Sequence, residues 1–380
     1  MSPQTEAELA EAIRAANGPL ELTGAGTKRA IGRPAPEATL LDLTGFSGIT
    51  LYEPDELVLS AGAATPRAEA EAALAKAGQS FAFEPPDLSR LLASGDAGTL
   101  GGMLSCNLAG PRRIKAGAAR DHILGVTGVS GRGEIFKAGS RVVKNVTGYD
   151  LPKLMANSWG TLAALTSVTF KVLPAAETEA TVALHGLDDA AAIRAMSAAM
   201  QSSCEVSGAA HLPASLGDAA RTLLRLEGIP VSIAYRRDKL VSILKSFGTA
   251  EVLEAAASRA QWIAVRDVHP LCDAPERAVW RISTTPSQGA ALLARLPQAR
   301  GYYDWAGGLI WLDHAIGEDG GAHAIRSALT AGHATLIRAP EAVRARVPVF
   351  QPQLPALAAL SQRVKNAFDP RGVLNPGRMG

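Results

Sequence analysis

The chain has 380 residues, of which 47% are hydrophobic and 19% charged, proportions typical of a folded globular protein. The formal net charge of +2 predicts no strong electrostatic field and argues against a nucleic-acid partner. No apolar run is long enough to cross a bilayer, and the N-terminus lacks the pattern of a signal peptide, so a cytoplasmic location is expected. Three scattered cysteines, Cys106, Cys204 and Cys272, and the spacing of the histidines predict no disulfide framework, iron–sulfur cluster or metal site.

The first 174 residues alternate short strands with turns and a few helices. Thr5 and Glu8 have the spacing of a capping box at the start of a helix. Pro66 is expected to be the first residue of a second helix, after the cap Thr65. A hairpin is expected around the turn at 130–133. Strands are predicted at 19–22, 39–43, 49–53, 57–62, 123–129, 134–138 and 165–172, and helices at 5–16, 66–77 and 150–157.

A loop of small residues, TGAGTKRAIG at 23–32, follows the first strand. Successive N–H groups around Gly24 and Gly26 can form a concave anion site, to which Thr27 adds a hydroxyl. The loop is not the dinucleotide fingerprint, because the third glycine of that pattern would fall at Arg29. A plain turn between two strands is the alternative interpretation.

A second stretch, GTLGGMLSCNLAG at 98–110, keeps glycine and small polar residues over the length of a helix. Glycine lets the backbone approach a flat or charged ligand closely, whereas an ordinary core segment would carry leucine or valine. A helix beginning near Leu100 would direct its N-terminal N–H groups at a phosphate. The alternative is a close helix packing contact that needs glycine. We interpret the stretch as part of a site for a large cofactor with a flat ring and a phosphate tail.

Other residues are candidates for chemistry, each with a structural alternative. The residues 159–162 allow another backbone approach to the same ligand, or form a sharp turn. Lys144 and Tyr149 would steady negative charge on a reduced ring if their loop lies beside it. Asp150 is expected to cap a helix. His314 is a candidate general base, although a lone histidine at a hairpin end is more often structural.

Two further residue types carry expectations of their own. Cys106 lies in an apolar helix and is expected to be inert packing rather than a redox thiol. Arg112, Arg113 and Arg141 are candidates for binding an anionic group, although exposed arginines are more often simply solvated.

A change of composition at 174–179 predicts a domain boundary. From 181 to about 286 the expected order is strand, helix, strand, strand, helix, strand, with helices at 188–201 and 231–247, which matches the split βαβ sandwich. A hairpin at 302–313 and helices at 322–331 and 354–368 follow. No internal repeat is apparent in the sequence.

Taken together, these segments resemble the vanillyl-alcohol oxidase or PCMH type of FAD-binding protein. GAGTKRAIG is similar to the first pyrophosphate loop of that family, and GTLGGMLSCNLAG to the second. KNVTGYDLPKLMANSWGTLAALTSVTFKVLP and FDPRGVLNPGRMG resemble the signature and the C-terminal tail of its D-lactate and glycolate dehydrogenase branch. The resemblance implies an α+β fold, with a two-subdomain FAD-binding domain at 1–174, a small ferredoxin-like cap or substrate domain at 175–335, and a C-terminal segment at 336–380 that returns to the FAD domain.

The resemblance also implies the cofactor and its contacts. FAD is expected to be non-covalent, because attachment in this family usually needs a histidine in or just before the first loop, and none is there. The family's metal-linked histidine cluster is missing from the cap, where His314 and His323 are at most a remnant. Tyr149 and His314 are then the candidate catalytic residues. The implied cofactor contacts are Thr23, Gly24, Ala25, Gly26, Thr27, Lys28, Asp96, Gly98, Thr99, Gly101, Gly102, Ser105, Cys106, Asn107, Gly110, Gly160, Thr161 and Leu162.

The implied function is that of the FAD-binding subunit of a glycolate dehydrogenase complex, which oxidises glycolate to glyoxylate. Its expected partners are glycolate, a second flavoprotein subunit and an iron–sulfur subunit, with the complex in the cytoplasm or at the inner face of the membrane. Two alternatives stay open. One is a stand-alone FAD-dependent 2-hydroxy-acid dehydrogenase of the D-lactate type. The other is a structural subunit with a degenerate flavin site, which the bulky Arg29, Cys106 and Trp159 favour. An NAD enzyme using Asp42 is disfavoured by the missing third glycine.

Overall fold

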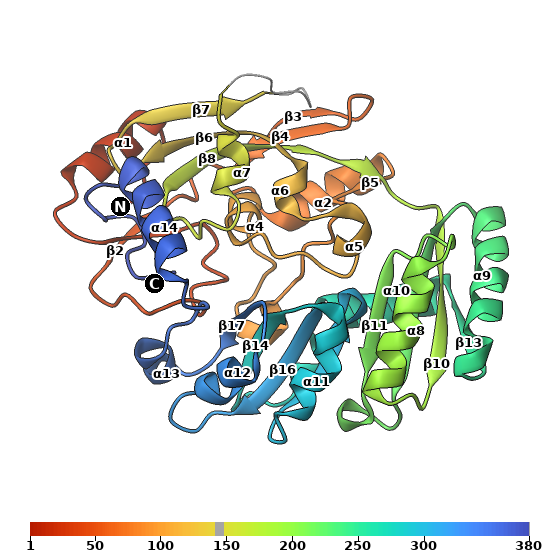
Figure 1. Cartoon of the computed structure of the whole chain (residues 1–380). Helices are drawn as coiled ribbons and strands as arrows, with labels where there is room; N and C mark the ends of the chain where they lie inside the picture. The colour runs from red at the N-terminus through yellow and green to blue at the C-terminus, as the bar shows by residue number, and fades with distance from the viewer. Residues whose placement is uncertain (141–147, 380) are drawn as a thin grey trace.

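The computed structural model describes residues 1–140 and 148–379 of the chain. It contains two large antiparallel sheets, which occupy different parts of the molecule (Figure 1). A five-stranded sheet is built from strands between residues 49 and 171, and an eight-stranded sheet from strands between 178 and 338. No helix in the described ranges is long and apolar enough to span a membrane.

The five-stranded sheet has helices on both faces. On one face, Leu74 of α2, Leu104 of α4 and Met155 of α7 pack in one core with Val168 and Phe170 of the sheet. The other face is covered by α1. The strands in sheet order are β3 (Ile49–Glu53), β4 (Val58–Gly62), β8 (Ala163–Lys171), β6 (Ile123–Ser130) and β7 (Ile135–Gly139). The helices of this part are α1 (Glu6–Ala15), α2 (Arg67–Lys76), α3 (Ser89–Leu92), α4 (Leu100–Cys106), α5 (Arg113–Ala116), α6 (Ala119–His122) and α7 (Leu151–Met155).

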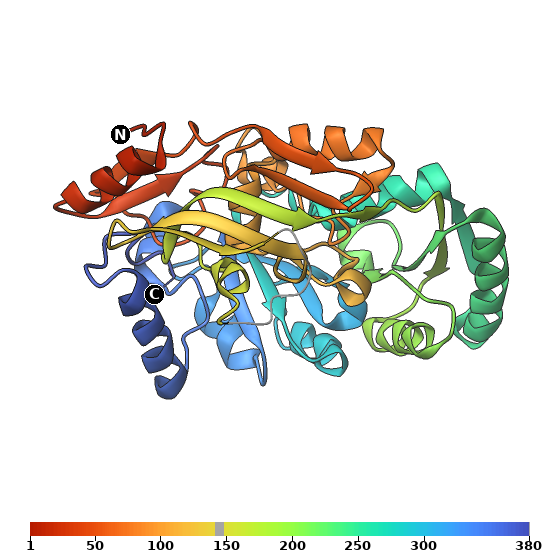
Figure 2. The ribbon, with the colours of Figure 1, turned by 90° about the horizontal axis from the view of Figure 1, so that it is seen from above.

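The C-terminal segment returns to the first strand. β1 (Leu20–Thr23) pairs in parallel with β2 (Thr39–Asp42), and Leu20 also forms a parallel bridge with Leu374. The short β5 (Gln79–Ser80) pairs with β9 (Leu173–Pro174) just before the second sheet begins. In Figure 2 the C-terminal α14 (Pro355–Phe368) projects from the same end of the molecule that carries the N-terminal helix.

The eight-stranded sheet consists of two βαββαβ units placed side by side. Its strand order is β13-β10-β12-β11-β15-β16-β14-β17. At the seam, β11 and β15 share a single registered pair, His211 and Tyr303. The first unit holds β10 (Thr178–His185), α8 (Asp189–Gln201), β11 (Gly208–Leu212), β12 (Arg221–Gly228), α9 (Pro230–Leu244) and β13 (Ala250–Glu254). The second holds β14 (Arg277–Ser283), α11 (Gly289–Ala294), β15 (Arg300–Asp304), β16 (Leu309–Ala315), α12 (Ala322–Ala328) and β17 (His333–Arg338).

The two faces of this sheet are both buried, against different neighbours. One face forms a core with α8, α9, α11 and α12, around Trp280. Side chains of the other face, such as Tyr302 and Trp311, pack with Leu108 and Trp159 from the N-terminal part of the chain. The helix α10 (Ala255–Arg266) contributes Trp262 to this second core. Alternation along each strand thus supplies two apolar faces, one of which joins the two parts of the molecule.

A buried ion cluster also joins the two parts. Glu84 accepts hydrogen bonds from both terminal nitrogens of Arg225, at 2.8 and 2.7 Å. Arg112 pairs with Glu227 on β12, and its backbone N–H donates to Glu84 at 3.0 Å. Arg225 also stacks on the Trp262 ring, with its Cζ 4.7 Å from the ring centroid. Arg112 was a candidate for binding an anionic partner, and its partners are carboxylates of the protein itself.

Most predicted elements are present, with changes at their ends. Thr5 caps α1 as expected, but the Glu8 carboxylate accepts from the backbone of Gln4 rather than of Thr5. Pro66 is the residue before α2 and not its first residue. Both predicted hairpins, the helix at 322–331 and the first βαββαβ order are confirmed. The helices α10, α11 and α13 (Glu341–Arg346) and the strand β17 were not predicted. The domain limits stay a prediction, and the one at 335 lies inside β17.

Candidate cofactor site

A pocket that is partly open to solvent lies where the loop after β1 meets α4. The pocket lies beside the end of the chain, which contributes two residues to its wall. The predicted contacts that line it are Thr23, Gly24, Ala25, Gly26, Thr27, Lys28, Thr99, Gly101, Gly102, Ser105, Cys106 and Gly160.

The two glycine-rich stretches touch each other at this pocket. A Cβ atom on Gly24 would lie 3.1 Å from the hydroxyl of Thr99. A Cβ on Gly98 would lie 2.8 Å from the hydroxyl of Thr27 and 3.1 Å from Nζ of Lys28. Gly98 also has φ +92°, a conformation that side-chain-bearing residues rarely adopt. Glycine therefore allows the two loops to approach closely and share one hollow.

The first loop supplies unused backbone donors. Within the described ranges, the N–H groups of residues 24–28 donate no hydrogen bond to another protein group. Gly26 has φ +71°, which helps to turn consecutive N–H groups toward one side. Unpaired donors of this kind are costly unless water or a ligand accepts from them. The loop therefore leaves several backbone donors free at the pocket wall.

The second stretch, at 98–110, lines the pocket but does not direct free N–H groups into it as predicted. The N–H groups of Leu100, Gly101 and Gly102 are all engaged, with Thr65 O at 3.0 Å, Ala63 O at 2.6 Å and the Thr99 hydroxyl at 3.2 Å. The start of α4 thus offers no free N–H groups to a phosphate, and that prediction is wrong. A Cβ on Gly101 would lie 2.8 Å from the carbonyl oxygen of Ala63, so close packing explains this glycine. By contrast, a Cβ on Gly102 would meet only the Thr99 hydroxyl, at 3.3 Å.

Two side chains that line the pocket, Lys28 and Arg378, have positive charges that nearby carboxylates do not fully neutralise. Nζ of Lys28 lies 3.3 Å from the hydroxyl of Thr27 and 3.4 Å from the carbonyl oxygen of Ala97, both neutral groups. Arg378 donates to Lys28 O at 2.9 Å, lies 3.7 Å from Glu21, and buries an Nε that has no partner. Burial lowers the pKa of both side chains, because a low-dielectric site disfavours their charged forms. An anion in the pocket would relieve this cost.

The C-terminal tail closes the wall of the pocket through Asn375. Its side chain accepts from Leu22 N at 2.8 Å and donates to Trp159 O at 2.8 Å, so it connects β1 with the turn before β8. A Cβ on Gly160 would lie 2.6 Å from Nδ2 of Asn375. Asn375 and Arg378 line the pocket but are absent from the sequence-based contact set, although their segment carries the tail motif.

Other predicted contacts lie outside the pocket lining and make structural bonds. Asp96 is exposed and accepts from the Gly98 N–H at 2.6 Å. Asn107 ends α4 in the left-handed conformation, with φ +48°. Gly110 packs against Glu84 and accepts from the Trp305 indole at 3.0 Å. Thr161 donates to Ser158 O at 2.7 Å, and Leu162 belongs to the core under the five-stranded sheet.

The candidate catalytic residues are not brought to the pocket. The Tyr149 side chain is 91% exposed. His314 is buried at the end of β16, where its Nδ1 lies 2.8 Å from Ala315 O. Asp150 caps α7 as expected, accepting from Lys153 N at 3.3 Å. Lys144 and Arg141 lie outside the described residues.

Cys106 lines the pocket and is almost fully buried. Burial raises the pKa of its thiol to about 11, although the charges of Lys28 and Arg378 act against this. The thiol is therefore protonated at neutral pH and is a poor nucleophile. This agrees with its expected role as inert packing. Within the described ranges, no group of three or more histidine, cysteine or acidic residues could hold a metal ion.

Comparison with known proteins places this chain in a family. Residues 1–139 match the FAD binding domain family. The chain is 36% identical to the glycolate oxidase subunit GlcE of Escherichia coli, over 95% of this chain and 92% of that protein. It is 34% identical to the glycolate oxidase subunit GlcD of Bacillus subtilis, over 45% of this chain and 34% of that protein. The structure of p-cresol methylhydroxylase matches all of this chain and 88% of its own, with a TM-score of 0.76 at 13% identity.

The class that follows is that of the FAD-dependent oxidoreductases with a PCMH-type fold. An alkyldihydroxyacetonephosphate synthase structure shares the same fold, with a TM-score of 0.72 at 14% identity, over 99% of this chain and 75% of its own. Within that class, the chain belongs to the family of the glycolate oxidase subunit GlcE.

Proposed function

We propose that this chain holds FAD non-covalently in the pocket between the loop at 23–29 and α4, as the FAD-binding subunit of a glycolate-oxidising complex. The observation that carries the proposal is the group of unpaired N–H donors at 24–28 beside Lys28 and Arg378. When bound, FAD supplies the two-electron acceptor for oxidation of a 2-hydroxy acid to a 2-oxo acid.

The residues present fit the diphosphate of FAD. Backbone N–H groups and two cations are the groups that proteins use for phosphate oxygens. Gly24, Gly98 and Gly102 keep the space between the stretches free of side chains. The orphan Nε of Arg378 gains an acceptor if a phosphate oxygen lies beside it. The pocket wall contains no histidine for a covalent flavin bond, and its one cysteine is protonated.

An electron-accepting partner is part of the proposal because the three cysteines are scattered and no metal-binding group of three occurs in the described ranges. The relative GlcE is named as a subunit, and we infer an iron–sulfur subunit and a second flavoprotein as partners here. The surface of α14 supports this. The helix has no buried residue, and Leu357 and Leu360 on it and Leu354 just before it are exposed.

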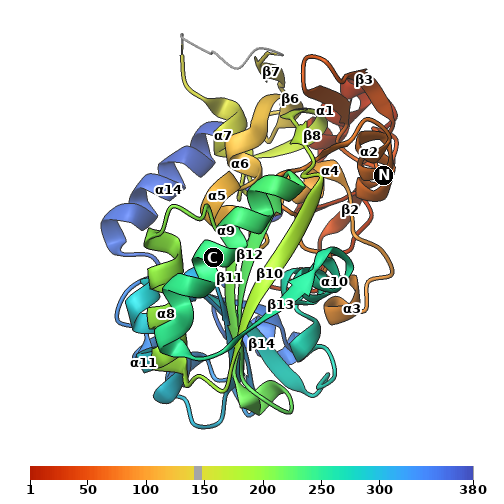
Figure 3. The same ribbon diagram turned by 90° about the vertical axis from the view of Figure 1, so that its right-hand side faces the viewer.

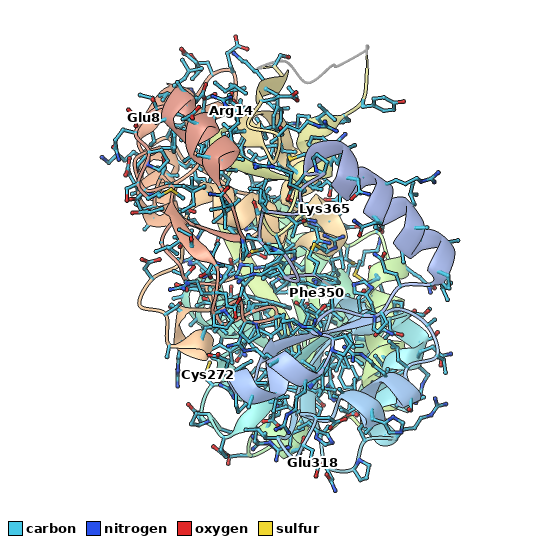
Figure 4. All side chains as sticks on the ribbon, turned by 90° about the vertical axis from the view of Figure 1, so that its left-hand side faces the viewer. Glu8, Arg14, Cys272, Glu318, Phe350 and Lys365 are labelled. Atoms are coloured by element: carbon cyan, nitrogen blue, oxygen red, sulfur yellow. The ribbon has the colours of Figure 1, made fainter. Side chains whose placement is uncertain are left out.

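The position of α14 suits an electron-accepting neighbour. Lys365, labelled in Figure 4, donates from α14 to Thr161 O at 2.6 Å and to Leu374 O at 3.0 Å. The exposed helix is thus attached to the two segments that close the cofactor pocket. In Figure 3, α7 lies on the same flank as α14. Since α14 carries no acidic residue and exposes Arg363, the matching surface is an apolar helix flanked by carboxylates on the partner subunit.

We expect the double substitution Leu357→Glu and Leu360→Glu to weaken association with the partner subunits roughly tenfold or more. Each leucine that is buried on binding contributes about 1.5–3 kcal/mol, and a glutamate would face the partner's carboxylates. Co-purification of the complex with a tagged chain measures the effect. Val231→Glu on α9, where the side chain is 81% exposed, is the control and should leave the complex intact. Unchanged association of the double variant, with normal FAD content, would show that the partner binds elsewhere.

The proposed function is tested by adding FAD to the purified chain and then adding glycolate without oxygen. The chain should become yellow and retain FAD through gel filtration, and acid precipitation should release the flavin. Bleaching by glycolate in the full complex, but not in the chain alone, supports the subunit role. Bleaching of the chain alone by D-lactate or glycolate supports the stand-alone dehydrogenase. A colourless chain that takes up no FAD would leave only the structural role.

A further inference from the structure

Two arginines from different parts of the chain meet at one tryptophan ring. The guanidinium carbon of Arg113, on α5, lies 5.1 Å from the ring centroid of Trp305, and that of Arg281, on β14, lies 5.0 Å from it. The charges of both arginines lower the pKa of His333 on β17, after burial as the first cause. Arg113 on α5, Arg281 on β14 and His333 on β17 are therefore close to one another, where the N-terminal part of the chain packs against the eight-stranded sheet.

No acid in the described ranges neutralises these arginines. Neither guanidinium takes part in a hydrogen bond or an ion pair there, in contrast to the neighbouring Arg112, which pairs with Glu227. Burial and, after it, the charge of Arg113 lower the pKa of Arg281 to about 10, and the charge of Asp304 opposes the change. Asp304 does not come within ion-pair distance, and burial raises its own pKa to about 7. The cluster therefore attracts an external anion.

The tryptophan is fixed in position beside the cofactor segment. Trp305 donates from its backbone to Asp304 at 2.7 Å and from its indole to Gly110 O at 3.0 Å. Trp305 and Ala306 have φ +52° and +56°, an unfavourable conformation that persists only where the surroundings enforce it. Gly110 is four positions beyond Cys106, the last pocket-lining residue of α4. The arginine cluster thus lies at the end of the segment that forms the cofactor pocket.

We propose that Arg281 and Arg113 bind the carboxylate of the 2-hydroxy-acid substrate, each part of the chain contributing one arginine. The planar guanidinium fork matches a carboxylate with two parallel hydrogen bonds, and stacking on Trp305 holds the fork in place. The inference rests on the proposed function for the identity of the anion, but it concerns residues outside the FAD pocket.

The test is calorimetric titration of the full chain, with and without FAD, using 2-hydroxy-2-methylpropanoate. This probe carries the carboxylate and hydroxyl but no hydrogen on the reacting carbon, so binding is measured without turnover. We expect Arg281→Met to weaken binding roughly 10- to 100-fold, and Arg113→Met to act in the same direction, because a charged hydrogen bond contributes about 1.5–3 kcal/mol. Arg281→Lys keeps the charge but loses the fork, and should lie between the wild type and Arg281→Met.

Arg326→Met is the matched control. Arg326 also stacks on a tryptophan, with its Cζ 5.3 Å from the Trp280 ring, but its guanidinium donates to the carbonyl oxygen of Pro348. This variant should bind the probe as the wild type does. Wild-type-like binding by Arg281→Met overturns the inference, as does failure of the wild type to bind. If Arg281→Met does not fold, unchanged binding by both Arg281→Lys and Arg113→Met overturns it. FAD uptake is measured separately, so normal uptake with no probe binding contradicts this inference alone.

Discussion

Lys28→Met is expected to weaken FAD binding roughly 10- to 100-fold while making the cofactor-free chain more stable. The loss of affinity follows because a charged hydrogen bond to a phosphate contributes about 1.5–3 kcal/mol. The gain in stability follows because Lys28 has only neutral partners, and burial already lowers its pKa in the empty pocket. Titration of the apoprotein with FAD and thermal unfolding of the apoprotein measure the two effects.

The opposite signs of these two effects separate a cofactor-binding lysine from a structural one. Lys115→Met is the control, because Lys115 is an exposed lysine outside the pocket, with its nearest carboxylate at 3.4 Å. It should leave both quantities unchanged. Arg378→Met should resemble Lys28→Met in FAD affinity. If Lys28→Met lowers apoprotein stability and leaves FAD affinity intact, Lys28 supports the loop and does not contact the diphosphate.

Glu84→Gln is expected to lower the free energy of unfolding by roughly 3–5 kcal/mol, the range for removing one partner of a buried ion pair. The Glu84 side chain is 14% exposed and that of Arg225 only 2%, so Arg225 would keep its charge with less compensation. Urea denaturation at neutral pH measures the change. The control is Asp273→Asn, because Asp273 pairs with Arg90 at 2.7 Å in an exposed bridge between the same two parts of the chain. It should cost less than about 1 kcal/mol.

The pH dependence of the same variant has a defined sign. Burial alone raises the pKa of Glu84, but the charges of Arg225 and Arg112 outweigh burial and hold the pKa at about 2. Because a glutamate in the unfolded chain titrates near pH 4.3, Glu84 contributes stability that is present above that pH and is lost as the pH falls toward 2. The size of this contribution is about 3 kcal/mol. Glu84→Gln should therefore lose less stability in acid than the wild type, and equal acid sensitivity of the two would contradict the assignment.

Local sequence patterns predicted those elements whose caps or alternation lie within the element itself. Thr5, Asp150 and the alternation in 165–172 act over a few residues, and the corresponding α1, α7 and β8 are present. The hairpin and α12 of the second βαββαβ unit were also predicted, but the unit was not recognised as a repeat of the first, because the repeat lies in strand order and burial rather than in residue identity. The helix α10 was missed because its contribution to the core depends on Trp262, which reaches Thr181 on β10 at 2.8 Å.

The cofactor pocket could be predicted in part, because its glycine-rich loops also carry a local sequence signal. Glycine at 24, 26 and 98 indicates close approach, and the structure brings these loops together. The sequence could not distinguish Gly101, which packs on Ala63, from Gly102, which faces Thr99, because the two are adjacent in one helix. Asn375 and Arg378 join the pocket only through long-range pairing of the tail with β1. Phe350, near the centre of Figure 4, likewise reaches Trp159 from a distant segment, with ring centroids 5.2 Å apart.

The central claim is that the loop at 23–29, with Lys28 and Arg378, holds the diphosphate of one FAD beside α4. It is tested most directly by titrating the apoprotein with FAD and, separately, with riboflavin, which has the flavin ring but no phosphate. One FAD should bind per chain, and riboflavin should bind far more weakly, because the free N–H groups at 24–28, Lys28 and Arg378 have nothing to contact in it. Equal affinity for riboflavin and FAD, or uptake of neither, would contradict the account.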